Sequence, residues 1–131
     1  MMARGWGSGL GLLMGLSLFP AYAQPQRVQF PPGASSTTLQ ATVRGYQVAE
    51  YVLRARAGQV MSVQVVSANP HVVFSMFDQE GRHFPGSPAE TTQWRGRLPS
   101  SGDYVIVAGL TRAAARRTSQ PVRLTLHVTI R

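Results

Sequence analysis

Arg112 and Arg116 are the two side chains whose type and spacing most directly indicate a binding surface. Residues four apart share a face of a helix, so both guanidinium groups would point the same way if this segment is helical. Like charges at that spacing destabilise an isolated helix by roughly a few tenths of a kcal/mol. An acidic partner would offset this repulsion, because guanidinium groups form charge-assisted hydrogen bonds with carboxylates. A solvated helix face with no partner is the alternative that the sequence leaves open.

A polar corner, Ser101-Gly102-Asp103-Tyr104, stands at the start of a strongly apolar run. Pro99 fixes one backbone angle before the corner, and Gly102 permits the angles of a tight reversal. The segment therefore predicts a stiff hairpin corner. A simple hairpin turn, in which Tyr104 is only the first core aromatic residue of the next strand, is the alternative, and the frequency of such turns between strands favours it.

The sequence contains few candidate catalytic or metal-binding residues. No serine lies in a G-x-S-x-G nucleophile motif, and the sequence has only five acids from which a glycosidase pair could be drawn. There is no cysteine, and His71, His83 and His127 lack the spacing of metal ligands. We therefore expect a protein that is not an enzyme and holds neither a cofactor nor a metal ion.

The charge of the chain is strongly one-sided. All 13 cationic side chains are arginines, against five acids. Such a positive field favours anionic partners: a nucleic acid, an anionic envelope surface or an acidic protein cleft. Arginines that serve only to keep the protein soluble are the alternative.

The N-terminal segment has the pattern of an export signal. Arg4 precedes an apolar stretch from Leu10 to Phe19, and the small-x-small sequence Ala21-Tyr22-Ala23 follows. We predict a signal peptide over residues 1–23, cleaved before Gln24, because the apolar stretch is too short to span a bilayer. The remaining residues, 24–131, form one predicted periplasmic domain with no membrane contact. Export argues against a nucleic acid as the partner.

Alternation of apolar and polar residues with period two dominates this domain. It predicts an all-β antiparallel sandwich of about seven to eight strands, or a barrel, with one short helix over 110–119. Residues 50–58 and 60–66 are predicted to pair as a hairpin across Gly58-Gln59. Residues 82–90 contain two prolines and a glycine and are predicted to form a loop. The other predicted strands are 39–46, 71–78, 91–98, 103–109 and 121–131.

Two long segments of the chain, residues 44–65 and 96–130, resemble the bacterial periplasmic inhibitors of goose-type (g-type) lysozyme, the PliG family. Less closely, they resemble the inhibitors of invertebrate-type lysozyme. The likeness runs from about Val28 to Ile130, and residues 74–96 match poorly. It rests on a Ser-Gly-x-Tyr motif, a Thr-Arg-x-x-Ala-Arg motif and a Gly-Tyr pair, here Ser101, Gly102 and Tyr104; Thr111, Arg112, Ala115 and Arg116; and Gly45 and Tyr46.

The resemblance implies a β-sandwich that inserts its rigid Ser-Gly-x-Tyr loop into the cleft of a g-type lysozyme. Ser101, Gly102 and Tyr104 would form the wedge, with Arg112, Arg116 and Tyr46 beside it. The protein would act as a monomer or a homodimer. The "Leu-Pro-x-Ser-Gly-x-Tyr" strand entry also resembles the pre-peptidase C-terminal domains of secreted proteases. A binding module of that kind, without inhibitory activity and directed at envelope glycans or proteins, is the alternative.

Overall fold

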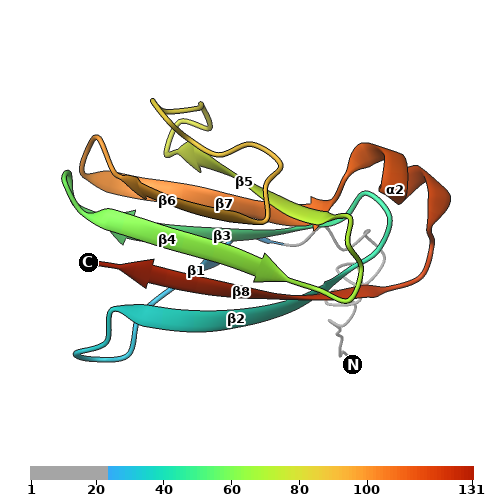
Figure 1. The fold of residues 1–131 in the computed structure, drawn as a ribbon. Coiled ribbons are helices and arrows are strands. Elements are labelled where there is room, and N and C mark those ends of the chain that lie inside the picture. The colour runs from blue at the N-terminus through green and yellow to red at the C-terminus, as the bar shows by residue number, and fades with distance from the viewer. Residues whose placement is uncertain (1–23) are drawn as a thin grey trace, which may run out of the picture.

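Two four-stranded β-sheets pack face to face in the computed structural model, which describes residues 24–131 (Figure 1). One sheet has the strand order β1-β3-β7-β5 and the other has the order β2-β8-β4-β6. The predicted all-β sandwich with one short helix is confirmed. The predicted signal peptide, residues 1–23, lies outside the described residues. The elements are β1 (Gln26–Arg27), β2 (Ser36–Val43), β3 (Val48–Ala55), β4 (Val60–Val66), β5 (Val72–Asp78), β6 (Gln93–Arg97), β7 (Gly102–Leu110), α2 (Arg112–Arg117) and β8 (Val122–Ile130).

The apolar positions of the alternating segments form the core between the two sheets. In β8 the inward residues predicted from the pattern are all buried: Val122, Leu124, Leu126, Val128 and Ile130. The same alternation buries every second residue of β3 and β4. Residue pattern alone therefore determines which face of each strand contacts the core.

Strand pairing differs from the expectation at two corners. β3 does not form a hairpin with β4: β3 pairs with β1 and β7, whereas β4 pairs with β6 and β8. The polar corner ahead of β7 is likewise not a hairpin turn, because β6 and β7 lie in different sheets. Both connections are arches from one sheet to the other. Alternation shows which face of a strand is buried. It does not show whether the next strand pairs beside it in the same sheet or faces it across the core, because both arrangements give the same alternating pattern.

The register of β3 and β7 defines two ends of the sandwich. Val48 pairs with Gly109, which places the β2–β3 turn at the same end as α2; we call this the helix end. Ala55 pairs with Gly102, which places the two arches, residues 56–59 and 98–101, at the opposite, corner end. Figure 1 shows α2 and the arches at opposite ends of the molecule. The nine residues of β7 between them span about 30 Å.

The segment between β5 and β6 is the loop that its prolines and glycine predict, and it closes one side of the core. Phe84 is buried there, with its ring edge-on to the rings of Trp94 and Tyr104. The indole Nε1 of Trp94 donates a hydrogen bond to the carbonyl oxygen of Gly86 (3.1 Å). Among the described residues, no helix has the length and apolarity needed to cross a membrane.

Candidate functional site

Tyr104 of the Ser-Gly-x-Tyr motif is a core residue. Its side chain is only 1% exposed, and its hydroxyl donates to the carbonyl oxygen of Ser100 (2.7 Å) and accepts from the Ser100 amide (3.2 Å). The expectation that Tyr104 forms part of the contacting wedge is therefore wrong, because a buried ring cannot contact a partner. The two hydrogen bonds to Ser100 explain why the motif contains this tyrosine: from the core, they stabilise the arch of residues 98–101.

Ser101 and Gly102 lie at the surface of the corner end. The exposed Ser101 accepts a hydrogen bond on Oγ from the Ala57 amide (2.9 Å), which ties one arch to the other. Gly102 has φ +144°, a conformation that favours glycine, and a Cβ there would lie 2.9 Å from Oε1 of Gln79. Backbone bonds from Gly58 to Leu98 and from Leu98 to Gln59 join the arches as well (2.9 and 2.8 Å). The corner is thus held in one shape by the neighbouring arch.

Charges of both signs meet at the corner end. Arg27 of β1 forms a two-pronged ion pair with Asp103 of β7, with N···O distances of 2.7 and 3.2 Å. The hydrogen bond from Arg27 lowers the pKa of the Asp103 carboxyl below its ordinary value. Two further acids lie nearby, since Asp78 pairs in register with Tyr104 and Glu80 follows in the next turn. An acidic partner would meet carboxylates as well as arginines here.

The helix end presents exposed arginines, with Glu50 two register positions away along β3. Ala114 and Ala115 bury one side of α2, which leaves Arg112 and Arg116 exposed on the other. Thr111 caps the helix, because its Oγ1 accepts from the Ala114 amide (3.4 Å). No ion pair within residues 24–131 involves an arginine of α2. These guanidinium groups are available to an anionic partner.

A fixed turn holds Tyr46 at this same end. Its side chain is 63% exposed, and Tyr46 is one of two large hydrophobic residues so exposed in the described part of the chain. The Arg44 amide donates to Oε1 of Gln47 (3.1 Å), and the Gln47 amide donates back to the Arg44 carbonyl oxygen (3.0 Å). Arg44 itself, which the sequence analysis did not single out, adds another exposed cation one residue from Gly45-Tyr46.

The six predicted site residues thus do not form one surface. Tyr46, Arg112 and Arg116 share the helix end; Ser101 and Gly102 lie at the corner end, a full strand away. The two motifs are close in the sequence, yet β7 runs between them and carries them to opposite ends. No cluster of three potential metal ligands occurs among residues 24–131.

Comparison with known proteins adds direct relatives. The chain is 34% identical to Aeromonas hydrophila PliG, a periplasmic lysozyme inhibitor of g-type lysozyme, over 83% of this chain and 97% of that chain, with a TM-score of 0.73. Salmonella Typhimurium PliG, with the same description, is 21% identical over 83% and 99% of the two chains (TM-score 0.63).

A more distant structure shares the fold alone. The pre-peptidase C-terminal domain of Bacillus anthracis collagenase is 7% identical over 86% of this chain and 100% of that domain (TM-score 0.54). No family model and no curated protein matches the sequence. The identity and near-complete coverage of the Aeromonas protein, on the same sandwich, show that this chain belongs to the PliG family.

Proposed function

We propose that this protein is a periplasmic inhibitor of g-type lysozyme and that it blocks the enzyme with its helix end. Membership of the PliG family supports the activity, since its Aeromonas relative is an inhibitor of that class and lies in the periplasm. The observation that carries the choice of surface is the exposed trio of Tyr46, Arg112 and Arg116 at one end of the sandwich, where no arginine of α2 forms an ion pair within residues 24–131.

The chemistry of a lysozyme cleft suits these side chains. Glycosidases cleave sugar polymers with paired carboxyl groups in a groove. Arg112 and Arg116 can donate charge-assisted hydrogen bonds to such carboxylates, and Tyr46 offers a rigid, amphipathic ring. Because a fixed turn and a capped helix hold these residues, less conformational entropy is lost on binding.

The Ser101–Gly102 corner is a second candidate for the contact. Its exposure and its bonds to the neighbouring arch support a rigid wedge. The bond that Ser101 Oγ accepts leaves its O–H free to donate. One feature disfavours this candidate: Asp78, Glu80 and Asp103 lie at that end. Entry of those carboxylates into an acidic groove would be opposed by repulsion.

A lysis assay separates the two surfaces. The domain of residues 24–131 should inhibit a g-type lysozyme, and Arg112→Ala combined with Arg116→Ala should weaken inhibition about 100-fold, since hydrogen bonds to charged groups contribute about 1.5 kcal/mol or more each. The matched control is Arg54→Ala with Arg56→Ala, which removes the same charge from the corner end. Ser101→Ala should change inhibition less than three-fold.

Two outcomes would contradict the proposal. Strong loss with Ser101→Ala, and none with the α2 double variant, would move the contact to the corner. Absence of inhibition by the unaltered domain at micromolar excess would favour the alternative, a non-inhibitory envelope-binding module of the pre-peptidase C-terminal type. Thermal unfolding of each variant checks that it remains folded.

A further inference from the structure

The outer face of the sheet β2-β8-β4-β6 has an unusual composition. None of its four strands contains an aspartate or a glutamate, although three of the five acids lie in strands of the other sheet. Serine, threonine and glutamine fill most of the outward positions, together with His127 and three arginines, Arg95, Arg97 and Arg123. The face is therefore polar and positively charged, and nothing in the described chain covers it.

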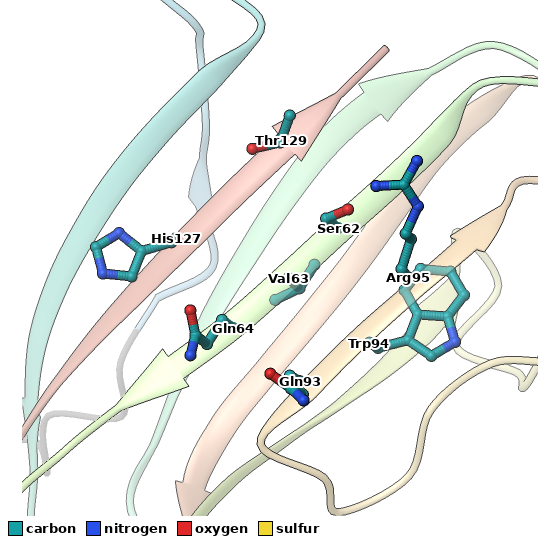
Figure 2. A pocket seen from close by; sticks show the side chains of 8 residues that line it. All are labelled: Ser62, Val63, Gln64, Gln93, Trp94, Arg95, His127 and Thr129. Atoms are coloured by element: carbon teal, nitrogen blue, oxygen red, sulfur yellow. The ribbon is translucent and has the colours of Figure 1, made fainter.

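A shallow groove crosses this face over three adjacent strands. It has a volume of about 480 Å³, and the side chains along it include Gln64 of β4, Gln93 and Arg95 of β6, and His127 of β8. Figure 2 shows these polar groups on neighbouring ribbons around Ser62 and Thr129. A smaller hollow of about 190 Å³ shares Ser62, Arg95 and Thr129 and extends the groove to the C-terminal Arg131. Together they form a track along the strands.

The hydrogen-bonding groups of this track are largely free. Within residues 24–131, no hydrogen bond or ion pair engages the side chains of Ser62, Gln64, Gln93 or Arg95. The nearest side-chain bond on the face joins Thr38 Oγ1 to His127 Nδ1 (3.1 Å). Amide, hydroxyl and guanidinium groups in a row are available to a ligand.

We propose that this track binds the glycan strands of peptidoglycan. Carboxamides and hydroxyls match the hydroxyl and acetamido groups of an amino-sugar polymer, and Arg95 matches the carboxylates of its peptide stems. The absence of acids makes the face complementary to an anionic polymer. A protein partner fits poorly, because the centres of protein interfaces are apolar and aromatic, whereas six of the eight side chains that line the groove are polar.

The position of the track would let the protein bind the wall and a lysozyme at the same time. The track lies on a flat side of the sandwich, whereas Tyr46 and α2 lie at one end. An inhibitor bound to the wall through this face would keep its helix end free. That end would then be held close to the polymer that a lysozyme attacks. Wall binding does not depend on the proposed inhibition, so each can fail alone.

Cosedimentation of the 24–131 domain with purified, insoluble peptidoglycan tests the inference. Arg95→Glu should weaken binding roughly ten-fold and leave lysozyme inhibition unchanged. Arg112→Glu is the matched control: it makes the same charge change on α2, and it should lose inhibition but keep wall binding. Gln64→Ala with Gln93→Ala alters no charge and should weaken wall binding several-fold.

Three results would overturn the inference. The unaltered domain could fail to sediment with peptidoglycan. Arg95→Glu and Arg112→Glu could weaken binding equally, which would indicate general attraction of a basic protein. Vesicles of phosphatidylglycerol could bind the domain as well as the wall polymer does, with the same sensitivity to Arg95→Glu, which would assign the face to an anionic lipid surface.

Discussion

At the scale of single residues, Tyr104 and Gly102 explain why a polar corner can be rigid. The hydroxyl of Tyr104 satisfies both backbone groups of Ser100 from inside the core, and Gly102 adopts the positive φ that the arch requires. The sequence was enough to identify the motif, and it left two alternatives for Tyr104, a core residue or a surface residue. The structure decides for the core alternative: Tyr104 is buried at an inward position of β7, with the ring of Phe84 edge-on to it.

Tyr104→Phe should destabilise the domain without abolishing inhibition. The change removes the bond to the Ser100 carbonyl oxygen and leaves the Ser100 amide without its partner, at a cost of about 1–2 kcal/mol. For a domain of this size that is a fall in Tm of roughly 4–10 °C. Calorimetry and the lysis assay check this pair of results. A loss of inhibition with an unchanged Tm would instead place Tyr104 in the contact.

The Arg27–Asp103 pair should stabilise the fold only above acidic pH. In the folded protein the pKa of the Asp103 carboxyl lies below its ordinary value of 3.8. The stabilisation from the ion pair is therefore fully present above the ordinary pKa and is lost as the pH falls through the folded pKa. Because the pair is exposed to solvent, the effect is small. The Tm of Asp103→Asn should lie slightly below that of the unaltered domain at pH 6 and should equal it near about pH 2. A constant difference at both pH values would contradict this assignment.

At the scale of elements, alternation predicted most strands but not their neighbours: β2 begins and ends three residues before its predicted bounds, and the two-residue β1 was not predicted. The strand β4 begins and ends at its predicted residues, and β5, β7 and β8 lie within one residue of theirs. The hairpin predicted for β3 and β4 is wrong because their partners come from distant segments, β7 and β8. The same long-range pairing separates the two predicted parts of the site, since the length of β7 fixes the distance between Ser101 and Arg112.

The short helix α2 needs its cap to present its arginines. It has no acid in its first turn, where Arg112 opposes the helix dipole, so the Thr111 side chain is the stabilising group at that end. Thr111→Ala should cost about 0.5–1 kcal/mol, at the low end for caps because the bond is 3.4 Å long. We expect weaker inhibition as Arg112 loses its fixed position, and Thr111→Ser should restore both stability and inhibition. Full inhibition by Thr111→Ala would show that α2 does not position the contact.

At the scale of the whole molecule, composition predicted an anionic partner but not where it binds. Thirteen arginines and five acids give the net charge, yet the fold sorts them. Asp78, Glu80 and Asp103 lie at the corner end, α2 carries only arginines with Glu50 two register positions away along β3, and the strands of one sheet carry arginines and no acids. The sequence could not predict this pattern, because Arg44 and Arg112, which share the helix end, lie far apart in the chain, and so do Arg95 and Arg123, which share one sheet. Their grouping follows from strand order alone.

This sorting predicts how inhibition depends on salt. If the arginine-bearing helix end approaches an acidic cleft, long-range attraction speeds encounter, and salt screens this attraction within about 10 Å at 0.1 M. Raising NaCl from about 0.05 to 0.5 M should lower the association rate constant roughly ten-fold and change the dissociation rate less. The Arg112→Ala, Arg116→Ala variant should show a shallower dependence, whereas Arg54→Ala with Arg56→Ala should keep the full slope. Stopped-flow measurement of both rates decides the matter, and equal slopes for the two double variants would mean that net charge, rather than the helix end, guides the encounter.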